Sequence, residues 1–293
     1  MQNYVSWGTN QFIFSNTIHP LSLPSETQVV EPSEGASSAF AAVARSPPRV
    51  VQPRWLNIVF DLNGILCACE EFRLRSSGLR FYPNSAPHSS TVPARVGPKL
   101  VWVRPSCFAF LHAVSEFATI SIWSSMRLGT TKAITQYLFR DMAPPKIILG
   151  QEHCARIATS VSAMGPKYLM VKGTQKEIFL KTLAVGLFPI NPELMSKDNT
   201  IIVDDSAYKH VLNDPENVLL SDTWSYRGDG PKDTSLLDVL LPWLQRLHNS
   251  ADLGLLSFRK EDPLGRPTLG LDPNNLEFIE LTNAIAVSDG LIY

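Results

Sequence analysis

The sequence has 293 residues, of which 44% are hydrophobic and 18% are charged, and its formal net charge is −1. This length and composition suit a globular protein with one full domain and tails, or with two small domains. The balanced charge gives no reason to expect direct binding of nucleic acid or attraction to a membrane surface. Because the sequence contains no uninterrupted apolar run of about 18 residues, no membrane-spanning helix is expected.

The four cysteines are Cys67, Cys69, Cys107 and Cys154. Their spacing lacks the paired C-x-x-C units of a zinc site, and a framework of two disulfides is not expected in so long a chain. We therefore expect buried or half-buried thiols in a reducing compartment.

The first 53 residues are rich in Ser, Pro, Gln and Ala and show neither helical nor strand periodicity. They are predicted to form a disordered or loosely packed leader. They lack the charged start and apolar core of a secretory signal. Glu26, Glu31 and Glu34 precede the first arginine, Arg45, which argues against a mitochondrial or plastid presequence. A nuclear or cytoplasmic location is expected, with a mitochondrial one as the less favoured alternative.

An ordered domain is predicted over residues 54–250. Its first strand is the apolar run Leu56–Leu62, which is closed by the turn-forming pair Asn63-Gly64. The polar, Ser/Pro-rich stretch from about residue 73 to 98 is too long for a plain connection. It predicts a flap, inserted into the domain and lying over its edge.

Helices and strands then alternate. A helix is predicted to begin at Ser106, its N-cap, and to turn Phe108, Phe110, Leu111 and Val114 inward. Further strands are predicted at residues 119–123, 146–149, 200–203 and 218–220. Further helices are predicted at residues 130–139, 175–185 and 233–248, the last of them kinked by Pro242.

Strands that alternate with helices indicate βαβ units. The predicted fold is therefore α/β: a single domain built on a doubly wound, mostly parallel sheet with helices on both faces. The C-terminal tail, residues 251–293, has mixed signals and receives no functional assignment.

Polar residues follow three of the predicted strands: Asp61 and Asn63, Ser124 and Ser125, and Asp204 and Asp205. Each group by itself is typical of a turn or a helix cap. The carboxyl ends of parallel strands meet at one edge of the sheet, however, so these groups are expected to converge. Carboxylates suit Mg²⁺, while hydroxyls and a lysine, Lys181, suit a phosphoryl group. Together they predict a magnesium site beside a phosphate pocket.

The same residues resemble the motifs of the haloacid dehalogenase superfamily. Within it they are most similar to the RNA polymerase II C-terminal-domain phosphatases and the NLI-interacting-factor-like phosphatases, and to a plant-type subgroup whose first motif also reads D-L-N-G. The matching segments, spread over residues 54 to 250, are Ile58–Leu66 (in place of D-x-D-x-T), Val103–Leu111, Ile120–Ser125, Phe179–Leu183, Ile201–Lys209, Asn213–Asn217 and Asp233–Leu244.

This resemblance implies catalytic and phosphate-binding roles for four residues. Asp61 would be the nucleophile that becomes an aspartyl-phosphate. Ser124, with Ser125 beside it, would hold the phosphate through hydroxyl and backbone groups. Lys181, with Lys176 as a second choice for this motif, would neutralise phosphate charge and orient Asp61.

The resemblance also implies a set of Mg²⁺ ligands. Asp61 would contribute its carboxylate, Asn63 its backbone carbonyl, and Asp204 would complete the site. Asp205 would bond nearby or coordinate through water. The implied partner is a phosphoprotein or phosphopeptide, and the oligomeric state is not indicated.

One departure from the family pattern affects the expected chemistry. The second aspartate of the first motif protonates the leaving group and later activates water, and here that position is Asn63. An amide has no proton to exchange at neutral pH, and general acid–base catalysis contributes about 10²–10⁴-fold. Ile65 also replaces the threonine of the motif.

Three interpretations follow from this departure. The chain is a weak or specialised Mg²⁺-dependent phosphatase, or a pseudophosphatase that binds phosphoprotein without turnover. In the third, it has a scaffold role like that of the phosphatase-like receptor of the mitochondrial inner-membrane import translocase. The absence of a presequence pattern and of a membrane span makes the third the least favoured.

Overall fold

The computed structural model describes residues 56–72, 92–171, 176–228, 230–249, 283, 285 and 291–292. Two units are distinguished, Met1–Val50 and Val51–Tyr293, and all described residues belong to the second. The predicted leader (1–53), most of the predicted flap (73–91) and most of the tail lie outside the described residues.

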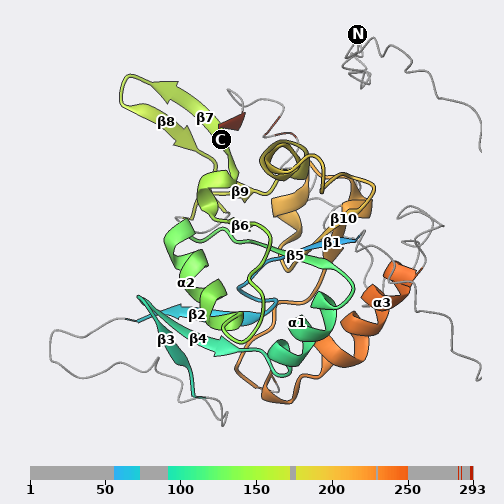
Figure 1. Ribbon diagram of the computed structural model, residues 1–293. Helices are drawn as coiled ribbons and strands as arrows, with labels where there is room; N and C mark the ends of the chain where they lie inside the picture. The colour runs from blue at the N-terminus through green and yellow to red at the C-terminus, as the bar shows by residue number, and fades with distance from the viewer. Residues whose placement is uncertain are drawn as a thin grey trace, which may run out of the picture. The chain divides into compact units, whose positions relative to one another are not determined.

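A five-stranded, fully parallel sheet forms the centre of the described unit (Figure 1). Its strand order is β11-β10-β1-β5-β6. The strands are β1 (Asn57–Phe60), β5 (Thr119–Trp123), β6 (Ile148–Leu149), β10 (Thr200–Asp204) and β11 (Val218–Leu220). All five predicted strands are present, and the prediction of a mostly parallel α/β sheet is confirmed.

The α-helices pack on one face of this sheet. They are α1 (Cys107–Ser115), α2 (Leu128–Leu138) and α3 (Leu241–Asn249). Side chains of alternate strand residues, such as Ile58 and Phe60, form one buried cluster with Leu111 and Leu244 of these helices. In Figure 1, α1 and α3 lie side by side beneath the sheet.

Short non-α turns cover the opposite face. They are the π-helical turn η2 (Leu183–Leu187) and the 3₁₀ turn η3 (Phe188–Ile190). Val59 and Ile202 of the sheet pack there against Leu183 and Leu187. Both faces are covered as predicted, but only one of them by α-helices. The remaining 3₁₀ turns are η1 (Gln151–His153), η4 (Ala207–His210), η5 (Pro215–Asn217) and η6 (Gly230–Lys232).

A three-stranded antiparallel sheet, which the sequence analysis missed, follows β1. It consists of β2 (Cys67–Glu71), β3 (Ala94–Val96) and β4 (Lys99–Val103), in the order β2-β4-β3. The end of the predicted flap is thus a strand. β2 has neither a long apolar run nor an alternating pattern, and it is a strand because its backbone pairs with β4, about thirty residues away in sequence.

A second antiparallel sheet contradicts the predicted helix at residues 175–185. The long hairpin of β7 (Ala155–Ser162) and β8 (Gly165–Tyr168) is joined by β9 (Phe179–Leu180) and by β12 (Leu291–Ile292) from the tail. Residues 179–180 are extended because they pair with β7, and the helical turn begins only at Leu183. Tertiary pairing therefore overrides the local helical pattern.

Ser106 is the N-cap of α1 as predicted, although its φ is +61° and its side chain makes no capping hydrogen bond. One expectation for this helix is wrong. Phe108 is 37% exposed instead of inward, and the Arg140 guanidinium lies 4.4 Å from the centre of its ring. The cation–π contact gives this side chain a partner at the surface.

The predicted closing helix is divided in two. A π-helical turn, η7 (Leu236–Leu240), precedes α3, and Pro242 is the second residue of α3. Because proline has no N–H to donate to the preceding turn, the hydrogen-bond pattern changes where it occurs. Within the described residues, no helix is both long and apolar enough to cross a membrane.

Candidate active site

The register of the central sheet brings the predicted site residues together. Phe60 of β1 pairs with Val203 of β10 on one side and with Ile122 of β5 on the other. Asp61 and Asp204 therefore follow paired residues, and Ser124 follows the end of β5. β10 lies on one side of β1 and β5 on the other, so the strand order reverses at β1, the switch point of the sheet. Open α/β sheets bind ligands at the edge formed by the carboxyl ends of the strands beside such a reversal.

A pocket of about 390 Å³ opens at this edge. Asp61, Asn63, Ser124, Ser125 and Asp205, all predicted site residues, line it. The other two predicted residues, Asp204 and Lys181, are fully buried beneath the pocket. The Lys181 ammonium contacts the carboxylates of both Asp61 and Asp204. The structure thus gathers every predicted site residue in one place.

Three carboxylates form the centre of the site. Asp61, Asp204 and Asp205 can each offer one oxygen so that the three oxygens lie within 4.8 Å of one another. Asp61 and Asp204 are buried, and Asp205 is half-buried. Hard oxygen ligands at such spacing fit the chemistry of Mg²⁺.

Lys181 binds two of these carboxylates. Its ammonium nitrogen lies 2.5 Å from Oδ2 of Asp204 and 3.3 Å from Oδ1 of Asp61. Asn213 holds the backbone here, because its amide donates to the carbonyl of Lys181 (2.7 Å) and accepts from the N–H of Leu183 (2.8 Å). Lys176, the second choice for this motif, is exposed and lines the pocket.

A second lysine, Lys209, was missed by the sequence analysis. Its ammonium nitrogen lies 2.9 Å from Oδ2 of Asp61, 3.0 Å from Oδ1 of Asp204 and 3.6 Å from Oδ1 of Asp205. One feature of the sequence could have indicated it: Lys209 lies four residues after Asp205, a spacing that brings opposite charges together on one side of a helical turn. Burial lowers the pKa of Lys209, but the three carboxylates outweigh burial and raise it well above its usual value.

The lysines act differently on the two neighbouring aspartates. Burial alone would raise the pKa of Asp204, but the ammonium groups of Lys181 and Lys209 hold it well below its usual range. Burial raises the pKa of Asp205, and the negative charges of Asp204 and Asp61 add to that effect. The site therefore contains one strongly paired carboxylate and one with reduced acidity.

His210 completes the surroundings of Asp204. Its Nε2 lies 3.2 Å from Oδ2 of Asp204, and its Nδ1 lies 3.1 Å from the amide nitrogen of Asn213. Burial lowers the pKa of His210. A neutral ring that accepts from Asn213 through Nδ1 carries its proton on Nε2, which lies beside the Asp204 carboxylate.

Asn63 is exposed at the pocket, where its amide oxygen accepts a hydrogen bond from the backbone N–H of Cys69 (2.8 Å). Ser124 uses its own backbone N–H within the sheet, where it donates to the carbonyl of Leu149 (3.0 Å). The Ser124 hydroxyl is therefore the group of this residue that remains for a ligand. It accepts from the N–H of Met126 (3.3 Å) and keeps its own proton to donate.

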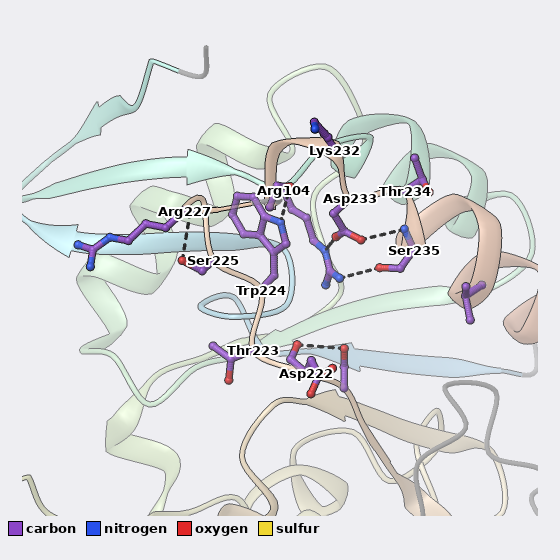
Figure 2. A pocket seen from close by; sticks show the side chains of 13 residues that line it. Arg104, Asp222, Thr223, Trp224, Ser225, Arg227, Lys232, Asp233, Thr234 and Ser235 are labelled. Carbon is purple, nitrogen blue, oxygen red and sulfur yellow. Dashed lines mark hydrogen bonds and ion pairs between the residues drawn. The ribbon is translucent and has the colours of Figure 1, made fainter. Parts of the chain in front are cut away.

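Arg104 fixes the loop that follows Asp61. Its guanidinium donates to the carbonyl of Ile65 (2.9 Å), to Asp233 (2.5 Å) and to the hydroxyl of Ser235 (2.7 Å). Figure 2 shows these side chains turned toward one another at a second pocket of about 730 Å³. Thr223, from the same pocket, donates to Oδ2 of Asp205 (2.9 Å), so this loop also orients the carboxylate cluster.

Gly64 allows close contact between this loop and Asp205. Its φ is +89°, and a Cβ at this position would lie 2.1 Å from Oδ2 of Asp205. Gly64→Ala is expected to lower the free energy of unfolding by more than the roughly 1–2 kcal/mol that a left-handed residue costs, because the clash adds to the strain. Denaturant unfolding measures the loss.

Gly97→Ala is the matched control. Gly97 also has a positive φ, +56°, but nothing lies within 4 Å of its Cβ position. This variant should show the backbone strain alone. Equal losses in the two variants would contradict the close contact between Gly64 and Asp205.

One family model and two solved structures are similar to this chain. The sequence profile described as NLI interacting factor-like phosphatase matches residues 56–254. No curated protein matches the chain significantly. Among solved structures, Fcp1, described as an essential RNA polymerase II CTD phosphatase, is 14% identical with a TM-score of 0.38. The alignment covers 80% of this chain and 63% of that one.

A second solved structure is a variant of the fission yeast RNA polymerase II CTD phosphatase Fcp1 bound to beryllium fluoride. It is 14% identical with a TM-score of 0.35, and the alignment covers 74% of this chain and 55% of that one. The chain thus spans less than two thirds of the length of both structures.

Proposed function

Because the chain belongs to the NLI interacting factor-like phosphatase family, we propose that it is a magnesium-dependent, phosphate-binding member that is weak or inactive on phosphoserine. One observation carries the proposal. The carboxylates and Lys181 converge at the switch point of the sheet, while Asn63 occupies the position of the general acid.

The binding steps follow from the positions of the side chains. Asp61 lines the pocket and is the proposed nucleophile toward phosphorus. The hydroxyl of Ser124 and the polar groups of Ser125 face the same pocket and would hold the phosphate oxygens. Lys181 orients the Asp61 carboxylate through their 3.3 Å contact.

The carboxylate cluster fits a Mg²⁺ ion. Asp61, Asp204 and Asp205, with the backbone carbonyl of Asn63, would hold it. When bound, the ion would supply positive charge to offset that of the incoming phosphate. Thr223 and Ser206 support this role, because their hydroxyls donate to the two oxygens of Asp205 and so fix its orientation.

Asn63 limits the proposed turnover. Its amide cannot protonate an alkoxide leaving group or accept a proton from water. Aryl and acyl phosphates need less protonation on departure and should react faster than phosphoserine. Breakdown of the phospho-enzyme should be slow for every substrate, because that step also needs a general base.

Binding of a phosphoprotein without turnover is the second candidate function. Asn63 favours binding without turnover, because the proposed phosphate- and metal-binding residues are present while the carboxyl group needed for acid–base catalysis is replaced by an amide. The proposed partner in either case is a phosphoprotein or phosphopeptide. A scaffold role without any phosphate binding is the third and least favoured candidate.

Beryllofluoride binding tests the proposal. The purified protein is expected to bind beryllofluoride only in the presence of Mg²⁺, as seen by fluorine NMR, because the adduct forms on an Asp61 carboxylate beside a cation. Asp61→Asn should lose this signal, because the variant lacks the carboxylate on which the adduct forms.

Asp198→Asn, which removes an exposed carboxylate, should bind as the unchanged protein does. Failure of the folded, unchanged protein to bind would reject phosphate binding and leave the scaffold role. Binding without hydrolysis of an aryl phosphate would favour the pseudophosphatase.

A further inference from the structure

We propose that the ammonium of Lys209 competes directly with the divalent cation for the carboxylates of the site. The inference deepens the proposed function, and it rests on that function only in taking Asp61, Asp204 and Asp205 as the metal site. The lysine would then act as a built-in cation that a metal ion must displace.

The geometry places the Lys209 ammonium on the same three carboxylates that would bind the metal ion. The Lys209 nitrogen is 2.9 Å from Oδ2 of Asp61 and 3.0 Å from Oδ1 of Asp204, and it donates a hydrogen bond to each. Its distance to the third carboxylate, that of Asp205, is 3.6 Å. An ion that binds oxygens at about 2.0–2.1 Å would have to occupy the space in which this ammonium lies.

The backbone of Lys209 is held in place. Its carbonyl accepts from the N–H of Lys181 (2.8 Å), and its N–H donates to the carbonyl of Ser206 (3.1 Å). The residue is also 4% exposed. The side chain is thus tethered at the carboxylates, and its effective concentration there is far above that of any cation in solution.

The charges of the site favour the same conclusion. Three carboxylates face two lysine ammonium groups, so Lys209 offsets much of the negative charge that would otherwise attract a divalent ion. A bound Mg²⁺ would place two positive charges beside two others within a few ångströms. Metal binding is therefore expected to require withdrawal of the Lys209 side chain.

Lys209→Met tests the competition. This variant is expected to bind Mg²⁺ at least tenfold more tightly than the unchanged protein, as measured by isothermal titration calorimetry without phosphate or substrate. The same change should appear with Mn²⁺ followed by electron paramagnetic resonance. At a fixed Mg²⁺ concentration, the metal should also raise the melting temperature of the variant more than that of the unchanged protein.

Lys99→Met is the matched control. Lys99 lines the same pocket, and its ammonium lies 3.9 Å from Glu71 instead of at the carboxylate cluster. Removal of this charge should change the Mg²⁺ affinity less than twofold. A similar gain in both variants would show a general effect of charge and overturn direct competition.

Lys209→Gln provides a second variant if the methionine variant does not fold, because glutamine can still donate a hydrogen bond to the carboxylates. Unchanged or weaker Mg²⁺ affinity in the folded variant would overturn the inference. The result is distinct from failure of the proposed function, since metal affinity is measured in the absence of phosphate. A protein that never bound beryllofluoride could still show the gain.

Discussion

Asn63→Asp is expected to raise the hydrolysis of an aryl phosphate at least tenfold. The replacement restores a carboxyl group that can exchange a proton, and general acid–base catalysis is worth about 10²–10⁴-fold. Asn63 already lines the pocket with Asp61, so the new group would lie beside the proposed nucleophile. Steady-state rates with an excess of Mg²⁺ measure the gain.

The structure indicates that the replacement leaves the loop intact. The amide oxygen of Asn63 accepts from the backbone N–H of Cys69 at 2.8 Å, and a carboxylate of the same shape accepts the same bond. Asn63→Ala is the matched control, because it loses that bond and gains no proton donor, and its rate should not rise.

The double variant Asn63→Asp, Asp61→Asn should lose the gain entirely, since the carboxyl at position 63 serves a reaction begun by Asp61. A folded Asn63→Asp variant with an unchanged rate would contradict the assignment of this pocket as a phosphatase site. The gain should be larger for an alkyl phosphate than for an aryl phosphate, because the poorer leaving group depends more on protonation.

Lys181→Met is expected to lower the free energy of unfolding by about 3–5 kcal/mol, the usual cost of removing one partner from a buried ion pair. The Lys181 side chain is fully buried, and its ammonium contacts Asp204 at 2.5 Å and Asp61 at 3.3 Å. Without it, Asp204 would keep a buried charge with fewer partners. Denaturant unfolding in metal-free buffer measures the change.

Lys176→Met is the control for this variant. Lys176 lies on the same segment but is exposed, and its replacement should change stability by less than about 0.5 kcal/mol. Similar losses in the two variants would show that the buried contacts of Lys181 contribute little.

The pH dependence provides a second readout. The pKa of Asp204 is held low in the folded protein, so its pairing stabilises the fold above the unfolded pKa of about 3.9 and is lost as pH falls through the folded value. The stability difference between the unchanged protein and Lys181→Met should therefore narrow below about pH 4.

The central sheet was predictable because its strands are short apolar runs buried on both faces. β5 and β11 have the predicted bounds, and β1 and β10 differ from them by one or two residues. A strand buried on both faces needs apolar side chains whichever strand it pairs with, so it can be recognised from its own residues. The same local character made the polar ends of the strands, and hence most of the candidate site, visible in the sequence.

The antiparallel sheets were not predictable in this way. β2 has no long apolar run, and β9 lies in a segment whose local pattern predicts a helix. Each is a strand because a distant segment pairs with it. Hydrogen bonds between backbones carry no side-chain pattern of their own. Phe108 is exposed for a different reason: helical periodicity does not reveal that the Arg140 guanidinium contacts its ring at the surface.

The sequence by itself determined where the buried strands lie along the chain and which chemical groups the site contains. These groups are the carboxylates and serines that follow the strands, the lysine Lys181, and the amide of Asn63 in place of a carboxyl. These depend on residue type and on local hydrophobic runs. Only the tertiary structure decided that the Lys209 ammonium lies among three carboxylates and that Gly64 lies against Asp205. Such contacts depend on how distant backbones pack, because ion pairing and steric fit act over a few ångströms of space, whatever the separation along the chain.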